Sequence, residues 1–237
     1  GKTTTVSMLN EVINACGQHS VACGNNGNPL IREVEELGFK DFAVIEISSF
    51  QLETLTSLRP HIAVITNITE DPLNRHYNME NYIFLKSKLL RNLRESEYAV
   101  LNYDDPIVRG LAKNTKARVV YFSIQSRVEG ADFQDGGLYY NGEKYLDVNE
   151  MSISGVHNVY NALACIAAAG ILGLDKRLAA SAICAFKGVS HRIEKIREVN
   201  GVTYIDDSKG TNVDAALKAA QAMQEPTIIL LGGKDKG

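Results

Sequence analysis

Apolar residues occur along this chain in two patterns, helical spacing and short continuous runs. Residues 2–15 show the first pattern, with Val6, Leu9 and Ile13 on one side of a helix. The run at 42–47 shows the second, which is typical of a strand buried on both faces. The predicted helices of this part are at 2–15, 78–93 and 106–112, and the strands are at 20–23, 42–47, 61–66, 98–101 and 117–122. This alternation predicts an α/β fold with a mostly parallel sheet flanked by helices.

The pattern changes between residues 130 and 148. Two glycine turns, Gly136-Gly137 and Asn141-Gly142, separate short aromatic runs and predict a small antiparallel hairpin appended to the main sheet. Helices at 156–172 and 176–185 follow. The first of these helices is an apolar stretch rich in Ala, which indicates a helix packed tightly inside a domain.

The last part of the chain predicts the start of a second, Rossmann-like α/β domain. Residues 191–199 and 202–205 form a predicted hairpin that turns at 200–201, and a helix from about 213 and a strand at 227–231 follow. We place the domain boundary near residue 188, which gives domains at 1–188 and 189–237. Both ends are expected to be cut, the first within a phosphate loop and the second just after a strand.

Composition narrows the function classes. The 237 residues are 45% hydrophobic and carry a net charge of −3, with no block of Lys or Arg, which disfavours nucleic-acid binding through a basic face. The four cysteines form no CxxC pair and indicate buried free thiols in the cytosol. His157, Asn158 and Asn161 interrupt the most apolar stretch, so a buried helix is favoured over a membrane span. These features predict a soluble cytoplasmic protein.

The first candidate for chemistry is Gly1-Lys2-Thr3-Thr4, which matches the end of a phosphate-loop (P-loop) motif at a helix start. Backbone N–H groups and the Lys would hold phosphates there, and the first Thr hydroxyl would bind Mg²⁺. An ordinary amino-terminal helix is a serious alternative, because a bare GKT at a helix start is common.

Carboxylates follow two of the predicted strands. Glu46 ends one strand and could hold Mg²⁺ at the carboxyl edge of the sheet, or it could be a solvated charge. Residues 66–71 (TNITED) end another strand, where a metal site and a turn built by Asn and Asp are equally favoured. Lys86 lies in a helix four residues after Tyr82, and the residues alone do not distinguish it from a solvated lysine.

Two further groups of polar residues come later in the chain. Asn158 and Asn161 lie three apart near a helix start, where they could bind adenine or cap the helix. Arg192 follows His191, and residues 206–212 (DDSKGTN) bring acidic, hydroxyl and cationic groups to a turn between a strand and a helix. Such crowding is costly unless the groups meet a ligand or each other.

Three blocks together resemble the Mur ligases, and the resemblance spans nearly the whole chain. They are EISSFQLE at 46–53, HNVYNAL at 157–163 and DSKGTN at 207–212. The first is close to the signature of the D-glutamate-adding branch of that family. The resemblance implies a UDP-binding domain, a central ATPase domain and a Rossmann-like third domain, of which this chain covers the second and the start of the third.

The same resemblance implies the reaction and its ligands. ATP and Mg²⁺ activate the carboxylate of UDP-N-acetylmuramoyl-L-alanine as an acyl phosphate, and the amine of D-glutamate attacks it to form an amide. The implied protein is a monomeric enzyme of peptidoglycan precursor synthesis.

Carried over by position, the resemblance assigns a role to individual residues. Nucleotide contacts are implied for Gly1, Lys2, Thr3, Thr4, Asn158, Asn161, Arg192 and Asp207. Metal ligation is implied for Thr3, Glu46 and Lys86 as a carbamate. Substrate contacts are implied for Asn25, Ser49, Thr211 and Lys236. A catalytic role near the reacting groups is implied for Lys2, Lys86, Lys209 and Lys236.

The chain departs from the family pattern at one position. Where the family has a His beside the second metal, this sequence has Pro72, which offers no side-chain ligand and no N–H. We expect a weakened or rearranged second metal site. This departure and Asn74 leave open a nucleotide-binding remnant without catalysis. A related amide ligase such as folylpolyglutamate synthase is a third alternative, and the block SSFQ at 48–51 speaks against it.

Overall fold

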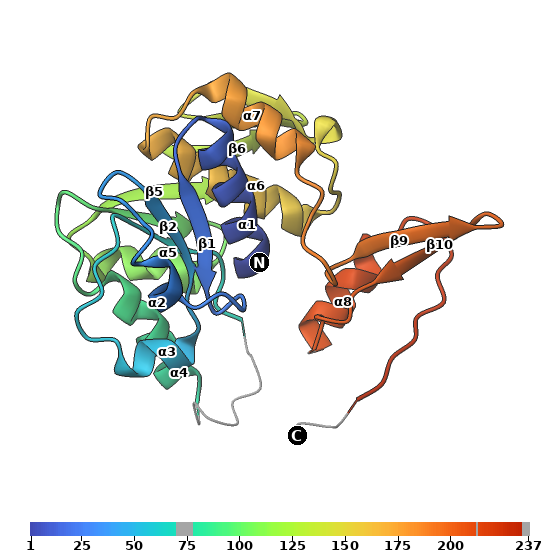
Figure 1. Ribbon diagram of the computed structural model, residues 1–237, viewed down its shortest axis with the longest axis horizontal. Coiled ribbons are helices and arrows are strands. Elements are labelled where there is room, and N and C mark those ends of the chain that lie inside the picture. Colours follow the sequence, from blue (N-terminus) through green and yellow to red (C-terminus); the bar gives the residue numbers. More distant parts are fainter. Residues whose placement is uncertain (70–77, 212, 234–237) are drawn as a thin grey trace.

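The computed structural model describes residues 1–69, 78–211 and 213–233, and it has the α/β architecture expected from the sequence (Figure 1). Its main sheet has six strands in the order β3-β4-β5-β6-β7-β8. These are β3 (Ile62–Ile65), β4 (Tyr98–Asn102), β5 (Arg118–Ser123), β6 (Gly130–Gln134), β7 (Gly137–Tyr140) and β8 (Glu143–Asp147). Strands β3 to β6 pair in parallel, and β6, β7 and β8 form an antiparallel meander. The parallel sheet and its antiparallel extension are both confirmed.

Two more parallel strands, β1 (Ser20–Gly24) and β2 (Phe42–Glu46), form a separate sheet. The sequence predicted these strands but not the division into two sheets, because an apolar run does not specify the strand with which it pairs. Gly24 lies opposite Glu46, so both strands end at the same edge. Gly24 has a φ of 98°, and a Cβ there would lie 2.3 Å from the carbonyl oxygen of Glu46, so this close approach requires glycine.

Two-residue turns of left-handed residues connect the strands of the meander. Asp135-Gly136 and Asn141-Gly142 all have positive φ, as type I′ hairpin turns require. The sequence placed the first turn one residue too late, since Gly137 already belongs to β7. The Asx residue before each glycine tolerates the left-handed region, and this explains the shift.

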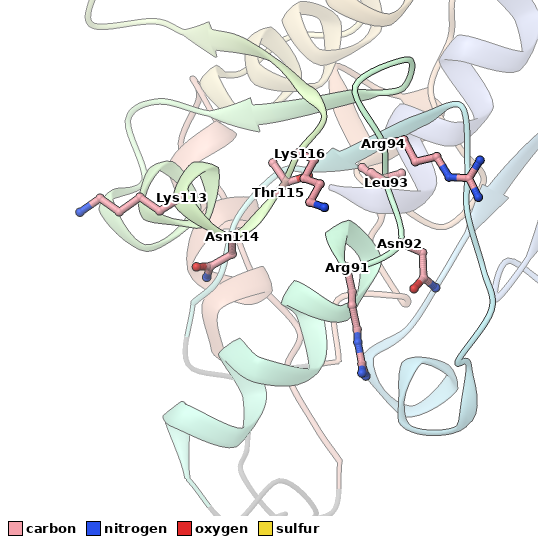
Figure 2. Close-up of a pocket in the computed structure, with 8 residues that line it drawn as sticks. All are labelled: Arg91, Asn92, Leu93, Arg94, Lys113, Asn114, Thr115 and Lys116. Atoms are coloured by element: carbon pink, nitrogen blue, oxygen red, sulfur yellow. The ribbon is translucent and has the colours of Figure 1, made fainter.

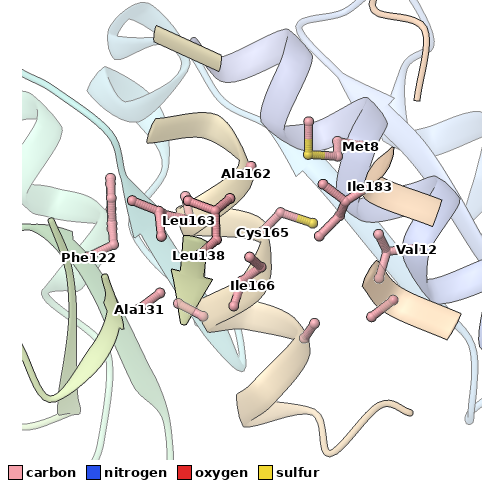
Figure 3. Packing of buried hydrophobic residues seen from close by; sticks show 14 of the residues in the cluster. Met8, Val12, Phe122, Ala131, Leu138, Ala162, Leu163, Cys165, Ile166 and Ile183 are labelled. Atoms are coloured by element: carbon pink, nitrogen blue, oxygen red, sulfur yellow. The ribbon is translucent and has the colours of Figure 1, made fainter. Parts of the chain in front are cut away.

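The core is built around α6 (Val156–Ile171), which packs against β4, β5, β6 and β7 of the main sheet. All residues from Ala162 to Ala169 have no exposed surface. Figure 3 shows Leu163 and Ile166 of this helix beside Phe122 of β5 and Leu138 of β7. Alanines on the rest of α6 let two further helices approach closely, α1 (Lys2–Ala15) and α7 (Lys176–Ala185). The predicted tightly packed helix is confirmed.

Two predicted helices end earlier than expected. Helix α4 (Met79–Ser87) continues as the 3₁₀ helix η1 (Lys88–Leu90), and α5 (Pro106–Gly110) continues as η2 (Leu111–Asn114). Three short helices were not predicted: α2 (Leu30–Glu33), α3 (Ser49–Thr54) and η3 (Val148–Glu150). Each is at most six residues long, too short to show helical periodicity in the sequence.

The last segment contains a hairpin of β9 (Glu194–Val199) and β10 (Val202–Asp206), followed by α8 (Val213–Ala222), and Figure 1 shows them beside the rest of the fold. The turn Asn200-Gly201 has positive φ at both residues, as predicted. The strand predicted at 227–231 is wrong: these residues form no strand, and Ile228 and Leu230 are almost fully exposed. A strand needs a neighbouring strand to satisfy its backbone groups, and none of the described strands pairs with this run.

Among the described residues, no helix is long and apolar enough to cross a membrane. The four cysteines are unpaired, as expected. Cys23 and Cys165 are buried, whereas Cys16 and Cys184 are half-buried.

The buried position of α6 predicts the effect of one truncation. Leu163→Ala should lower the free energy of unfolding by about 2–5 kcal/mol, because it removes apolar contacts and leaves a cavity in the core. Leu178 of α7 makes a matched control, since it is 48% exposed, and Leu178→Ala should cost less than about 0.5 kcal/mol. Chemical denaturation followed by circular dichroism measures both. Equal losses in the two variants would contradict the assignment of α6 as the centre of the core.

Candidate functional site

The amino end of α1 is an open group of backbone donors. The helix begins at Lys2 after Gly1, and no side chain caps its first turn. The first N–H groups of a helix have no partner within it and carry a partial positive charge. Thr4 and Thr5 are buried behind this end, whereas Gly1 and Lys2 are exposed. The predicted phosphate-loop residues therefore lie where an anion could meet free N–H groups.

Glu46 lies at the carboxyl end of β2 and is 5% exposed. Its Oε1 accepts a hydrogen bond of 3.1 Å from Nδ2 of Asn25, the residue that follows β1. Its Oε2 is buried and has no hydrogen-bond partner. An ionised carboxylate oxygen in this state is costly unless a cation or donor meets it. The predicted metal ligand and the predicted substrate residue Asn25 are thus in direct contact.

Arg192 reaches α1 from the far end of the sequence. Its Nη2 donates to Oγ1 of Thr3 over 3.4 Å, and its Nε is buried without a partner. Among the described residues, two buried side-chain polar atoms lack a hydrogen-bond partner: this Nε and Oε2 of Glu46. One atom is anionic and the other is cationic, and both lie near the start of α1.

The charges around this end act on one another. Arg192, Lys2 and Lys218 add positive charge near Gly1, and Glu46 adds negative charge there. Lys218 belongs to α8 and was not among the predicted site residues. No pattern in the sequence singles it out, because a lysine on a helix is ordinarily solvated.

The asparagines of α6 connect that helix to α1. Asn161 is 2% exposed, and its Oδ1 accepts a hydrogen bond of 3.1 Å from Oγ1 of Thr5. Its Nδ2 donates to Oδ1 of Asn158, whose own Nδ2 donates to the carbonyl oxygen of Ser154. Both amide groups therefore already make hydrogen bonds within the protein. An adenine that contacted them, as predicted, would have to share these groups with their present partners.

His157 was also missed as a member of this site. Its ring lies against Gly155, whose φ is 98° and at which a Cβ would be 2.8 Å from the ring. Burial lowers the pKa of His157, and the positive charge of Lys218 lowers it further, while Asp207 opposes the shift. The ring is therefore neutral at neutral pH and can donate or accept a hydrogen bond.

Lys86 lies on α4, beside the loop that follows β3. Its Nζ donates to the carbonyl oxygen of Asn67 over 3.0 Å and lies 4.5 Å from the centre of the Tyr82 ring. The amine thus faces the loop after β3, beside which the second Mg²⁺ is predicted. Pro72 and the rest of 70–77 lie outside the described residues.

The remaining predicted residues are spread over three places. Ser49 is the first residue of α3 (Ser49–Thr54). Ser48 caps this helix and forms a capping box with Gln51. Asp207 uses its Oδ1 to accept a hydrogen bond from the N–H of Ile193. Lys209 and Thr211 are exposed in the loop before α8. Lys236 lies outside the described residues.

Two hollows of the described surface lie away from the start of α1. One of about 470 Å³ is found where the chain enters β4 and β5, at the opposite ends of these strands from Asn102 and Phe122. Figure 2 shows its cationic side chains pointing away from one another, Arg91 and Lys113 among them. This arrangement is unsuited to holding one small ligand, so the amino end of α1 remains the candidate site.

Comparisons with known proteins show the family and the fold of the chain. Residues 1–169 match the sequence pattern of the family described as Mur ligase middle domain. The chain is 47% identical over 242 residues to the UDP-N-acetylmuramoylalanine–D-glutamate ligase of Thermoanaerobacter sp. (strain X514), and 40% identical over 247 residues to that of Clostridioides difficile (strain 630). Each match covers 100% of this chain and 53% of the relative, so the chain spans about half the length of the curated relatives it matches.

Solved structures show the same fold at lower identity. MurF from Acinetobacter baumannii superposes with a TM-score of 0.76 at 19% identity, over 96% of this chain and 52% of that one. The UDP-N-acetylmuramate-alanine ligase MurC from Thermotoga maritima gives 0.70 at 24% identity, over 94% and 51%. The α/β fold is common to all three. Because the family pattern covers most of its residues, the chain belongs to the Mur ligase family.

Proposed function

We propose that this chain is the ATP-binding part of a ligase that adds D-glutamate to UDP-N-acetylmuramoyl-L-alanine. The relatives at 40–47% identity carry that activity in their names, and the block EISSFQLE at 46–53 supports the same substrate. The observation that carries the proposal is the pair of unpartnered buried atoms, Oε2 of Glu46 and Nε of Arg192, beside the open start of α1. A cation and an anion together would satisfy both, and Mg²⁺ with a nucleotide phosphate is such a pair.

The residues present fit this ligand. The carboxylate of Glu46 and the hydroxyl of Thr3 would hold the metal, which neutralises phosphate charge when bound. Lys2, Arg192 and the N–H groups of α1 would hold the phosphates. Because the backbone N–H groups of α1 are fixed by the helix before binding, they need little rearrangement when charge develops on the transferred phosphoryl group.

The proposed reaction has two steps. A carboxylate oxygen of UDP-N-acetylmuramoyl-L-alanine attacks the terminal phosphorus of ATP, and ADP leaves with the bond electrons. The D-glutamate amine then attacks the acyl carbon, loses a proton, and expels inorganic phosphate to give the amide. Ordering the reactants in one site supplies much of the rate enhancement in such reactions.

Further roles follow from the same proposal. Lys86 would ligate a second Mg²⁺ as a carbamate, and Asn25 and Ser49 would contact the UDP-linked substrate. The residues expected near D-glutamate and the reacting phosphate are Lys209, Thr211 and Lys236. Asn158 and Asn161 would border the adenine, and Asp207 would approach ATP. Residues 1–188 would form the ATP-binding domain and 189–237 the start of the next, in a monomeric cytoplasmic enzyme.

A second candidate is a nucleotide-binding member of the family that does not catalyse. Pro72 favours it, because the position lacks the metal-binding His of the family pattern. The two candidates share the site at α1 and differ in the second metal.

Because Oε2 of Glu46 has no partner, we expect substitution of Glu46 to change the stability of the protein and its Mg²⁺-dependent ATP binding in opposite directions. Without metal, Glu46→Gln should raise the free energy of unfolding by about 1–2 kcal/mol, since a neutral amide is cheaper to bury than an unpaired charge. The same variant should lose the Mg²⁺ dependence of ATP binding. Thermal unfolding in chelator and calorimetric titration with ATP measure the two effects.

Glu97 offers the matched control, since it is also a buried glutamate. Its carboxylate accepts hydrogen bonds from the N–H of Arg94 and from Ser96, and it pairs with Arg59. These bonds lower the pKa of Glu97. Glu97→Gln should therefore lower stability and leave Mg²⁺-dependent ATP binding unchanged. If Glu46→Gln behaved like Glu97→Gln in both assays, Glu46 would not be a metal ligand.

Pro72→His in a full-length version of the protein distinguishes the two candidate functions. It should raise phosphate release that depends on both D-glutamate and UDP-N-acetylmuramoyl-L-alanine, because it restores an imidazole at the second metal. ATP binding at α1 should not change. Phosphate release that remains at background in both proteins would refute the ligase, and a folate offered in place of the UDP-linked substrate tests the related amide ligase.

A further inference from the structure

Arg192 lies between two residues with unusual backbone geometry. His191 has a φ of 66° and Ile193 has a φ of 47°, both in the left-handed region. A β-branched residue such as Ile rarely adopts this region, which costs about 1–3 kcal/mol and persists only where the surroundings impose it. The turn that presents Arg192 must therefore be held by other groups.

Carboxylates hold this turn on both sides of Arg192. The N–H of His191 donates to Oε2 of Glu194 over 2.7 Å, and the N–H of Ile193 donates to Oδ1 of Asp207 over 3.1 Å. Both strained residues thus have their N–H groups bound by acceptors that are charged, and such hydrogen bonds are stronger than neutral ones.

The ring of His191 adds a third link. Its Nδ1 lies 2.6 Å from Oδ2 of Asp206 at the end of β10. Hydrogen bonds from His191 and from Ser208 lower the pKa of Asp206 to about 2, so Asp206 is ionised at neutral pH. The carbonyl oxygen of His191 also accepts from the N–H of Lys209 over 3.1 Å. The ring and the backbone of His191 therefore both connect the turn to the loop after β10.

We propose that His191, Glu194 and Asp206 form a positioning clamp that holds Arg192 at the start of α1. The clamp explains how Arg192 reaches Thr3, 189 positions earlier in the chain, while its Nε stays buried and unpartnered. It also gives Asp207 a positioning role through Ile193 in addition to the contact with ATP proposed above. The functional meaning of the clamp rests on the proposed function, in which the start of α1 binds phosphate.

The ligand atoms of the same three side chains lie within 4.8 Å of one another, a spacing that would also suit a metal ion. Hydrogen bonds already engage the ring of His191 with Asp206 and the carboxylate of Glu194 with the backbone. These bonds favour a clamp that works without metal.

A double-mutant cycle tests the clamp. We compare Mg²⁺–ATP affinity in the unmodified chain, His191→Ala, Arg192→Ala and the double variant. Arg192→Ala should weaken binding about ten- to a hundredfold, as expected for the loss of a charged hydrogen bond, and His191→Ala should approach that loss. The double variant should bind no more weakly than Arg192→Ala, because His191 acts through Arg192. Additive losses, or full affinity in His191→Ala, would overturn the clamp.

Conservative and surface variants separate positioning from general damage. Asp206→Asn keeps an acceptor for the His191 ring and should retain most of the affinity, whereas Asp206→Ala should behave like His191→Ala. Lys195→Ala removes an exposed ion pair with Glu198 in the same hairpin and should have no effect. Equal losses in Asp206→Asn and Asp206→Ala would contradict the hydrogen-bonded link.

Amide hydrogen exchange tests the clamp without nucleotide. The N–H of Ile193 should exchange slowly in the unmodified chain and faster in His191→Ala, but not in Lys195→Ala. If the unmodified chain does not bind Mg²⁺–ATP while this exchange pattern holds, the proposed function fails and the clamp remains as a structural feature. Fast exchange of Ile193 in the unmodified chain would overturn the clamp, as would fast exchange that appears only after chelation of metal.

Discussion

The buried hydrogen bond between Thr5 of α1 and Asn161 of α6 joins the core of the fold to its candidate site. Helix α6 packs against four strands of the main sheet, and α1 packs against α6, α7 and the separate pair β1 and β2. A buried polar group must keep its partner, so this bond restricts how α1 can rotate or slide along α6. The direction in which the open end of α1 points is therefore set by the apolar core.

Around that end, the structure keeps charges that reduce its stability in the absence of a ligand. Oε2 of Glu46 and Nε of Arg192 are buried without partners, and Lys2 and Lys218 add positive charge near Gly1. Selection for stability alone would replace these groups or give them partners, because a buried charge without a partner is among the features that destabilise a fold most. Their presence together at one helix start supports the proposed ligand, a cation together with an anion, whereas the hollow lined by Arg91 and Lys113 has no carboxylate in its lining.

The sequence predicted the elements whose signal is local. Helix α6 was predicted from its apolar composition, and the turns at 141–142 and 200–201 from Asn-Gly pairs, because these depend on residues close in the chain. The strand predicted at 227–231 failed because strand formation depends on a pairing partner, which apolar character does not guarantee.

Site residues divide in the same way. Lys2, Thr3 and Glu46 could be found from position, since a helix start and a strand end are visible in the sequence. The contact of Arg192 with Thr3 and the approach of Lys218 and His157 to Gly1 could not, because each joins segments more than 150 residues apart. Motif resemblance named Arg192, but only the fold shows that its Nε is unpartnered.

The conformation of residues 191–193 carries this argument one step further. Left-handed His and Ile residues on both sides of Arg192 raise the free energy of the folded state, so the local sequence does not favour this turn. The carboxylates that hold it come from β9, from the end of β10 and from the loop after β10. The contact of Arg192 with α1 therefore depends on groups that the hairpin of the last segment and the loop after it supply. Completion of the anion site would then be coupled to the placement of the hairpin, since the same carboxylates that relieve the strain also fix the direction of the guanidinium group.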